Sequence, residues 1–496
     1  MKSMLLYKFL LFFIFLSNVI EGQPTFTYSR STTDDERIFD AAEDESGNYY
    51  FAGRVYSDDP YYKAAYLLSL DPNGQLIYEN IFLVPDSVSY FGNIYCQNDS
   101  IIIFGAKGSI ADALIDQLWM LVLDNSFNII CNRSFTISGS YIGDLESTIN
   151  QQGHYVICGN LTIPPQIMPD IFLFEISPIG DSIRSTILAY TGIELEFDLL
   201  ENREGGYKVF AKGNFPGAPN TNGKIVYLDT SFNYIWADSI PYGLKFGHTA
   251  KWLSRNTFLI TGYKNIYSPS FHEDLGIVKV DQQNNILNQN HFGKLADTID
   301  YVGACSNLDL GKNNDIYFGG ASNIIPEQGL FQNEPSWILL NNLDTNLNLN
   351  WQQFYGGDAA YYLWGLEATN DGGCLLMATR YDAELQDQEL DIYILKVDSN
   401  GLLTSNGQDF NIPVQELSIS PNPAHDRVNI SYPDIFGNDK KELILYNALG
   451  VAVLKENASY DHSTETINIS SLPGGLYFVV LKVEGRKVAT GKVVKI

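Results

Sequence analysis

The chain alternates short apolar runs with polar turns, and one such unit recurs seven times. Its first copy, Ala65–Tyr78 (AYLLSLDPNGQLIY), has two apolar runs around a turn that opens with Asp71. The residues that open this turn in successive copies are Asp71, Asp124, Ser177, Asp229, Asp281, Asp344 and Asp398, spaced 53, 53, 52, 52, 63 and 54 residues apart. Short apolar runs joined by Gly, Asn and Asp turns indicate antiparallel strands. A period of about 50 residues favours propeller blades over solenoid coils.

A second unit recurs between these turns: a polar turn, a short strand and a closing Gly. Its first copy is Asp44–Gly53 (DESGNYYFAG), and the last copy, Asn370–Thr379, has lost the Gly. Together the two units predict four strands per repeat. In the first repeat these are Ile38–Glu43, Tyr49–Gly53, Ala65–Leu70 and Leu76–Phe82.

The two ends of the repeat region predict how the ring closes. The fourth strand of the last repeat is weak, because Leu402–Leu403 runs directly into the polar Thr404–Gln408. Pro24–Arg30 (PTFTYSR) has the pattern of a fourth strand with no strand before it. Supplying the last blade's outer strand from the N-terminus would remove an open sheet edge. We therefore expect a seven-bladed β-propeller over residues 23–404. The alternative is an ordinary β-sandwich whose turns recur by coincidence.

The longest insertions fall at one repeated position, between the second and third strands. They are rich in Pro, Asn, Asp and Tyr, which indicates surface loops. They are Tyr56–Tyr62, Leu161–Met168, Phe215–Asn222, Lys264–Glu273, Asn323–Glu334 and Tyr381–Leu390. We expect these loops to gather on one face of the ring, which would be the natural binding face. Loop extension without function is the alternative.

The first residues predict export. Met1–Gly22 has a positive start with Lys2 and Lys8 and an apolar core at Phe9–Leu16, which is typical of a secretory signal peptide cleaved before Gln23. A retained membrane anchor would need about 20 apolar residues. The region lacks the Cys that a lipid anchor requires. No later segment is predicted to span a bilayer.

A different pattern follows the repeats. The period stops near Ser405–Val414, which we interpret as a linker over residues 405–414, and seven short strands over Gln415–Ile496 are typical of a small Ig-like β-sandwich. This region carries the motifs Pro421-Asn422-Pro423, Leu449-Gly450, Leu472–Tyr477 (LPGGLY) and the closing Lys492–Lys495. In their order and spacing these motifs resemble the C-terminal sorting domain of the type IX secretion system.

The resemblance implies an export route and a partner. It implies passage through the periplasm, translocation across the outer membrane by the type IX machinery, and usually removal of the tail. The product would be secreted or held at the outer cell surface on lipopolysaccharide. Short motifs at Asp86, Asp181, Asp238 and Asp297 are similar to O-glycosylation sites of Bacteroidetes envelope proteins. A plain adhesive Ig-like module is the alternative for the tail.

Composition and charge narrow the function classes. Among 496 residues there are 31 Tyr and 28 Phe but only 18% charged residues, which suits half-buried strands rather than surface helices. The formal net charge of −27 disfavours nucleic acids and anionic membranes as partners. The five Cys have no Cys-x-x-Cys spacing, so neither a zinc site nor a disulfide framework is predicted.

The sequence assigns no catalytic, cofactor-binding or metal-binding residue. The seven turn residues recur at a structural turn around a ring, whereas catalytic carboxylates must converge in one pocket. The six His are dispersed, and no nucleophile elbow, P-loop or dinucleotide fingerprint occurs. Ser69–Gly74 is near the sialidase Asp-box, but it has one residue too many and lacks the Trp. Aromatic patches such as Tyr361–Trp364 suit either sugar stacking or sheet packing.

Two function classes remain. We favour a non-catalytic secreted or surface propeller that binds a glycan or a protein. The alternative is a secreted enzyme that degrades a polysaccharide or peptide in the central funnel of the propeller. An enzyme requires two or more ionisable groups that converge where the first strands of the blades meet.

Overall fold

The chain divides into two compact units, Met1–Gly407 and Gln408–Ile496. The computed structural model describes residues 23–403 and 415–496, except for residues 59–60, 85, 111–113, 138–139, 166–167, 191–194, 220–222, 242, 246–247, 268–270, 294–297, 313, 384–388, 432–440, 448–451, 459–463 and 484–485. The predicted signal peptide, the linker and the Leu449-Gly450 motif lie outside the described residues. No helix in the described part is long and apolar enough to cross a membrane.

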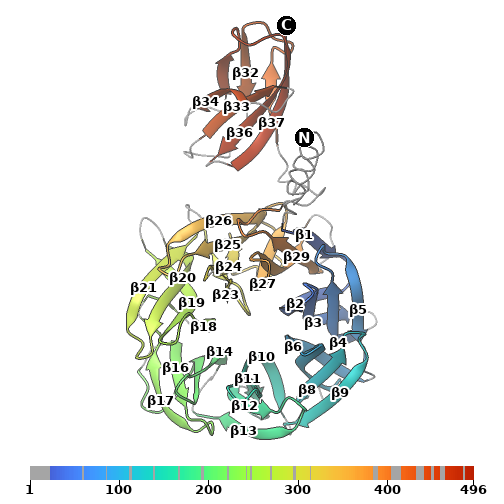
Figure 1. Cartoon of the computed structure of the whole chain (residues 1–496), viewed down its shortest axis with the longest axis vertical. Coiled ribbons are helices and arrows are strands. Elements are labelled where there is room, and N and C mark those ends of the chain that lie inside the picture. Colours follow the sequence, from blue (N-terminus) through green and yellow to red (C-terminus); the bar gives the residue numbers. More distant parts are fainter. Residues whose placement is uncertain are drawn as a thin grey trace, which may run out of the picture. The chain divides into compact units, whose positions relative to one another are not determined.

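The first unit is a ring of seven antiparallel sheets, which confirms the predicted all-β propeller (Figure 1). Blade 1 has β2 (Asp35–Glu43), β3 (Tyr49–Asp58), β4 (Tyr61–Leu70) and β5 (Leu76–Phe82). Blade 2 has β6 (Ser87–Gln97), β7 (Ser100–Ser109), β8 (Leu114–Asp124) and β9 (Ile129–Thr136). Blade 3 has β10 (Tyr141–Ile149), β11 (Tyr155–Thr162), β12 (Asp170–Ile176) and β13 (Ser182–Leu188). Blade 4 has β14 (Leu195–Glu201), β15 (Tyr207–Lys212), β16 (Gly223–Leu228) and β17 (Tyr234–Ser239).

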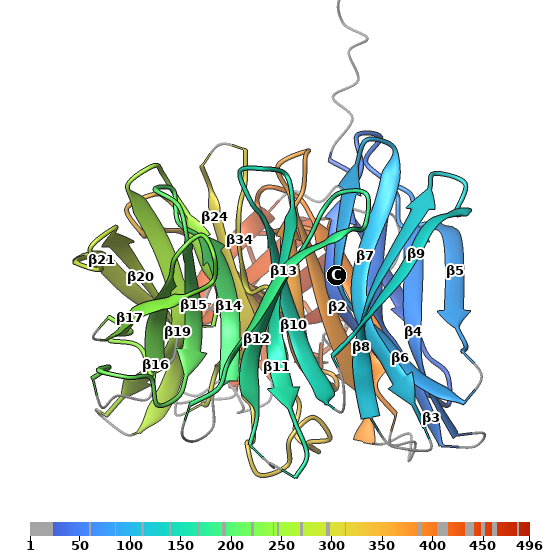
Figure 2. The same cartoon turned by 90° about the horizontal axis from the view of Figure 1, so that it is seen from below.

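The remaining three blades depart from this pattern more. Blade 5 has β18 (Ala250–Trp252), β19 (Thr257–Ile266), β20 (His272–Asp281) and β21 (Ile286–Phe292). Blade 6 has β22 (Tyr301–Val302), β23 (Leu308–Leu310), β24 (Ile316–Ser322), β25 (Trp337–Leu343) and β26 (Leu349–Gly356). Blade 7 has β27 (Ala360–Ala368), β28 (Cys374–Tyr381), β29 (Asp391–Val397) and, at its outer edge, β1 (Phe26–Arg30). In each blade the strands run between the two ends of the ring (Figure 2).

Burial explains the apolar runs of the sequence. The third strand of each blade lies between two neighbouring blades, so both of its faces are covered. All seven residues of β12, for example, are buried. The fourth strand lies at the rim, and most of its residues are exposed, as in β21. The core is therefore a set of apolar layers between adjacent blades.

The recurring turn residues have the predicted structural role. The Oδ1 atom of Asp71 accepts hydrogen bonds from the backbone N–H groups of Asn73 and Gln75, both at 2.8 Å. The Asp at the equivalent turn of the other blades does the same, while Ser177 accepts one bond from the N–H of Asp181 at 3.0 Å. These bonds fix the hairpin between the third and fourth strands.

In the propeller, the Gly that closes the second strand of a blade is required because two backbones approach closely there. A Cβ atom at Gly53 would lie 1.9 Å from the carbonyl oxygen of Arg37, and one at Gly105 would lie 2.1 Å from that of Tyr90. Each Gly sits beside the β-bulge in the first strand of its blade, where the two backbones come together. The bulges also direct side chains into the centre of the ring, as described below.

β1 joins the two ends of the ring. It pairs antiparallel with β29, from Phe26 opposite Lys396 to Arg30 opposite Ile392. Phe26 is 4% exposed, and its ring centroid lies 5.8 Å from that of Tyr49 in blade 1. Arg30 forms ion pairs with Glu36 and Glu79, also in blade 1. The N-terminal strand thus contacts both the last blade and the first.

Two of the predicted surface loops are wrong. Tyr56–Tyr62 lies largely in β3 and β4, which pair as far as Asp58 opposite Tyr61, and Lys264–Glu273 lies partly in β19 and β20. These insertions continue the hairpin because their Tyr residues favour strand geometry. The rings of Tyr56 and Tyr61, for instance, contact each other across the two strands at 5.9 Å.

The second unit has two sheets around a shared core. One contains β30 (Gln415–Glu416), β37 (Arg486–Lys495), β36 (Gly475–Val483), β33 (Lys441–Asn447) and β34 (Ala452–Ala458). The other contains β31 (Ser418–Ser420), β32 (Arg427–Ser431) and β35 (Thr464–Asn468). The predicted strand Gln415–Ile419 is therefore two short strands, because the chain changes sheets at the buried Leu417. The Ig-like classification stays a prediction.

Candidate functional site

The first strands of the blades line two adjacent cavities at the centre of the ring, which together we call the channel. One has a volume of about 320 Å³ and is lined by residues near the start of the first strands. These include Phe39, Phe197, Tyr362 and Trp364, and we call it the aromatic cavity. The other, of about 550 Å³, is lined near the end of the first strands and includes Asp198, Lys251, Asp309 and Glu367; we call it the charged cavity. The residues shared by both are Asp40, Asn93, Glu146, Cys305 and Ser306. These volumes lie in the usual range for small-ligand sites.

Bulges in the first strands place the aromatic side chains in the cavity. The register of β2 skips Phe39, that of β14 skips Phe197 and that of β27 skips Trp364. A bulged residue is left unpaired, and the extra residue turns its side chain out of the regular alternation. The three rings therefore reach the cavity instead of packing between blades.

The aromatic side chains form two groups in the cavity wall. In the first, Trp364 meets Phe39 edge to face at 5.6 Å and lies 5.2 Å from Tyr362. In the second, His248 lies 5.0 Å from Phe197 and 4.9 Å from Tyr263. Burial lowers the pKa of His248 to about 4. At neutral pH its imidazole is therefore uncharged, and the second group carries no positive charge.

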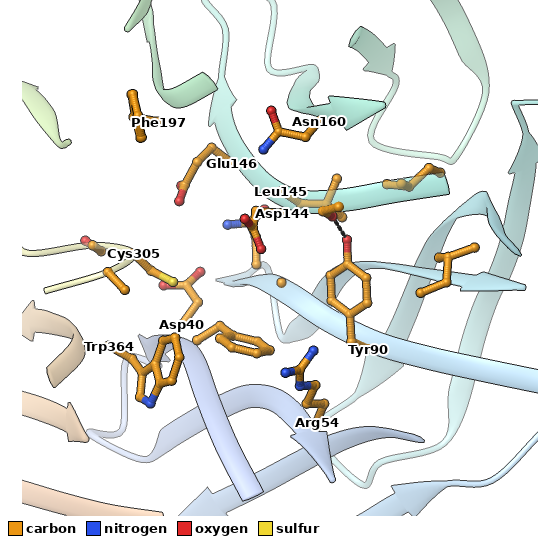
Figure 3. A pocket seen from close by; sticks show the side chains of 18 of the residues that line it. Asp40, Arg54, Tyr90, Asp144, Leu145, Glu146, Asn160, Phe197, Cys305 and Trp364 are labelled. Carbon is orange, nitrogen blue, oxygen red and sulfur yellow. Dashed lines mark hydrogen bonds between the residues drawn. The ribbon is translucent and has the colours of Figure 1, made fainter. Parts of the chain in front are cut away.

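Three carboxylates converge between the two aromatic groups (Figure 3). Asp40 comes from β2, and Asp144 and Glu146 come from β10. Burial raises the pKa of the nearby Cys305 thiol, and the charges of Glu146, Asp144 and Asp40 raise it further. The thiol is therefore protonated at neutral pH and is a poor nucleophile.

Asp144 lies in the bulge of β10. The buried Leu145 pairs with the closing Gly159, as Ile38 pairs with Gly53 in β2, so Leu145 fills the apolar repeat position and the register skips Asp144. The Asp144 side chain is open to the cavity, and desolvation there raises its pKa. An exposed carboxyl group on a bulge in the cavity wall makes Asp144 a candidate functional residue.

The first strand of blade 6 is interrupted, and this brings Cys305 to the channel. Between β22 and β23 the backbone leaves β24 and bonds to β27 of the next blade. The N–H of Cys305 donates to the carbonyl oxygen of Trp364 at 2.7 Å, and the N–H of Ala304 donates to that of Leu363 at 3.2 Å. The interruption places Cys305 in the wall of both cavities, beside the three carboxylates.

Two carboxylates of the channel connect adjacent blades. Asp40 accepts a hydrogen bond from the backbone N–H of Ile94 in blade 2 at 2.9 Å, and Asp198 accepts one from Ala250 in blade 5 at 2.5 Å. The two Asp residues occupy the same repeat position. Burial raises the pKa of Asp40 to about 6 and also raises that of Asp198.

The charged cavity holds an ion pair beside a further carboxyl group. The Lys251 ammonium lies 2.6 Å from an Asp309 carboxylate oxygen. The other Asp309 oxygen accepts a hydrogen bond from the N–H of Ala368 at 2.8 Å. Burial raises the pKa of Glu367, and the neighbouring Asp309 raises it further. These contacts link blades 5, 6 and 7, so we assign this end of the channel a structural role.

The stability of the ring should depend on pH through Asp40 and Asp198. Because the folded-state pKa values exceed the ordinary value of 3.8, both groups stabilise the fold when protonated, and this contribution is lost as the pH rises from about 4 to 7. The double variant Asp40→Asn, Asp198→Asn keeps both acceptors without the charge. We expect its melting temperature to exceed that of the wild type at about pH 8 and to match it at about pH 4.

Calorimetric melts at both pH values, with wild type and variant compared at each, provide the measurement. Comparing variant with wild type at the same pH cancels the effect of His248 on stability. That effect has the opposite sign, because the folded-state pKa of His248 is lowered and its contribution to stability is gained as the pH rises. An equal difference between variant and wild type at both pH values would show that these carboxyl groups do not control the pH dependence.

The outcome for the sequence predictions is mixed. The seven turn residues do not converge; they hold hairpins around the rim. The ionisable groups that do converge, Asp40, Asp144 and Glu146, were not assigned from the sequence, and they meet the condition set there for an enzyme. The aromatic patch Tyr361–Trp364 serves both predicted purposes, because Tyr361 is 2% exposed in the sheet while Tyr362 and Trp364 line the cavity. In the described residues no group of three or more His, Cys, Asp or Glu side chains is placed to hold a metal ion.

Comparison with solved structures finds several proteins of low similarity. The β-propeller domain of the Trilobed protease from Pyrococcus furiosus is 8% identical with a TM-score of 0.41, over 77% of this chain and 98% of that one. An α-L-arabinanase from Penicillium chrysogenum is 11% identical with a TM-score of 0.34, over 61% and 91%. An exo-β-1,3-galactanase from Phanerochaete chrysosporium is 9% identical with a TM-score of 0.33, over 84% and 96%. These scores are low, so the fold is taken from the strand pairing of this chain alone.

Comparison with curated proteins finds no match. The comparison with family models finds one for the second unit: residues 418–496 match the secretion system C-terminal sorting domain. The match covers the Pro421-Asn422-Pro423 and Leu472–Tyr477 motifs and the closing strand. The C-terminal unit is a secretion system C-terminal sorting domain, and it marks this chain for export to the cell surface or beyond.

Proposed function

We propose that the exported propeller binds a glycan in the aromatic cavity. The observation that carries this proposal is the alternation of half-buried aromatic rings with hydrogen-bonding side chains around one cavity. Trp364 and Phe39 offer ring surface for the C–H face of a sugar, while Asp144, Glu146 and Asn160 offer groups for its hydroxyls. The groups come from blades 1, 3 and 7, so a ligand would contact several blades at once.

The size of the cavity favours a glycan over a protein. A stable protein partner usually covers about 800 Å² of surface on each side. A recessed cavity of about 320 Å³ instead accepts one end of a chain or a small molecule. The aromatic cavity lies toward the end of the propeller at which the second strands finish. This end also carries the longest insertions.

Removing the indole side chain of Trp364 should weaken glycan binding. Trp364→Ala deletes the bulged indole, and we expect the dissociation constant for the bound oligosaccharide to rise about tenfold or more. Isothermal titration calorimetry with hits from a glycan array measures the change. Trp236→Ala is the matched control, because Trp236 lies on the outer strand β17 and is 46% exposed. Unchanged affinity in a folded Trp364→Ala variant would remove the cavity as the site.

Hydrolysis of the bound glycan is a second candidate function. It is favoured by the convergence of Asp40, Asp144 and Glu146, since glycoside hydrolysis uses a pair of carboxyl groups. Asp40 already bonds to the next blade, so Asp144 and Glu146 are the groups that would act. A polysaccharide-turnover assay on the same array hits tests this: product release that is lost in Asp144→Asn, with binding kept, identifies an enzyme. Binding without product release identifies a lectin-like module.

A further inference from the structure

Arg54 is a cation in the aromatic cavity whose Nε atom has no partner. It lies in β3 opposite Arg37 of β2, and it lines the cavity. Its Nε atom is buried and has no hydrogen-bond partner in the structure. Its guanidinium carbon lies 5.6 Å from the ring centroid of Phe39. In Figure 3 the guanidinium group points from β3 toward the space between Asp40 and Tyr90.

The acidic groups around Arg54 do not neutralise it by direct contact. Asp35 is bound by Arg37, with Nη2 and Oδ2 2.8 Å apart. Asp144 lies near enough to influence the charge of Arg54, but among the described residues no carboxylate forms an ion pair with it. Burial lowers the pKa of Arg54, and Arg37 lowers it further. A buried guanidinium N–H without a hydrogen-bond partner is destabilising, so an anion that accepts a hydrogen bond from it would be favourable.

We propose that the glycan bound in the aromatic cavity is acidic, and that a uronic acid carboxylate binds Arg54. This inference rests on the proposed function. The planar guanidinium fork matches a carboxylate and pairs with it through two parallel hydrogen bonds. Lys63 lines the same cavity and adds a second positive charge.

The two sides of the cavity suit the two ends of an acidic sugar. Arg54 and Lys63 come from blade 1, whereas Asp144, Glu146 and Asn160 come from blade 3. A uronic acid carries its carboxylate at one ring position and its hydroxyls at the others. It can therefore place the carboxylate on blade 1 and the hydroxyls on blade 3, with its ring against the aromatic groups.

The net charge of −27 acts against an acidic ligand at long range. At physiological ionic strength this repulsion is screened over about 8 Å, whereas a contact inside the cavity is screened much less. The overall charge should thus slow association more than it weakens the bound complex. Raising the salt concentration should not abolish binding, as it would for a surface ion pair.

The experiment measures the full chain by calorimetry against uronate oligosaccharides, each paired with its methyl ester. The ester keeps the sugar and removes the charge. We expect the wild type to bind the acid about tenfold or more tightly than the ester, because a hydrogen bond to a charged group is strong. Arg54→Gln should bind both forms equally, and Arg54→Lys should keep part of the preference. Arg133→Gln is the control, since Arg133 is exposed on the outer strand β9.

Each outcome decides a different point. Equal binding of acid and ester by the wild type, or a preference that survives in a folded Arg54→Gln variant, overturns the assignment of the carboxylate. Binding of neutral or sulfated oligosaccharides in place of uronates overturns it too, while the proposed glycan site stands. Failure of every sugar, acidic and neutral, to bind the wild type overturns the proposed function itself. Thermal melts confirm that each variant is folded.

Discussion

A chain that lacks residues 23–31 should not form a stable propeller. The deletion removes β1, so β29 loses its outer neighbour and blade 7 exposes an unpaired edge. It also removes the contacts of Phe26 and Arg30 with blade 1. Truncating a buried Phe alone costs about 3–5 kcal/mol, and the deletion adds the loss of five pairs of strand residues to this. We expect aggregation, or a large fall in melting temperature measured by circular dichroism.

Point variants separate strand loss from trimming of the terminus. Phe26→Ala should destabilise the ring by about 3 kcal/mol or more, whereas Ser29→Ala, at an exposed position of the same strand, should change stability by less than about 0.5 kcal/mol. A deleted chain that melts within about a degree of the parent would show that the ring closes without β1.

Deleting residues 415–496 should stop export while leaving the propeller folded. The tail forms its own compact unit with its own core, so the propeller does not depend on it for folding. The matched sorting domain lies wholly within the deleted segment. In a host with the type IX secretion system, we expect the truncated protein in the periplasm and almost none outside the cell. Immunoblots of cell fractions measure the distribution.

A substitution within the tail tests whether its fold is needed. Val479 is fully buried in the core of the second unit, so Val479→Asp should unfold the unit and reduce export as the deletion does. Ser470→Ala, at an exposed position, should be exported normally. Normal amounts of the truncated protein outside the cell would contradict the role of the tail.

The fold was predictable from the sequence because each repeat has the same pattern of apolar strands and polar turns. Asp71 and its equivalents mark the hairpin between the third and fourth strands of each blade, and the lone strand before the first repeat indicates how the ring closes. Strand ends were less predictable. Tyr-rich insertions such as Tyr56–Tyr62 have the composition of loops and the propensity of strands, and only pairing across the hairpin decides between them.

The site was not predictable, because it is built where the repeat fails. Asp144 reaches the cavity because it lies in the bulge of β10, and the sequence alone does not locate that bulge. Trp364 reaches the cavity through a bulge that has no sequence signature of its own. Cys305 is brought to the channel by an interrupted strand, and Tyr301–Leu310 is no longer than a complete first strand, so its length gives no signal of the interruption.

The location of the bound glycan is tested most directly by a crystal structure of the full chain grown with its tightest-binding oligosaccharide. We expect density for the terminal sugar in the aromatic cavity, with its ring against Trp364, its hydroxyls on Asp144 and Glu146, and its charged group on Arg54. Density confined to the outer loops or to the second unit, with the aromatic cavity free of sugar, would contradict a binding site at the centre of the ring.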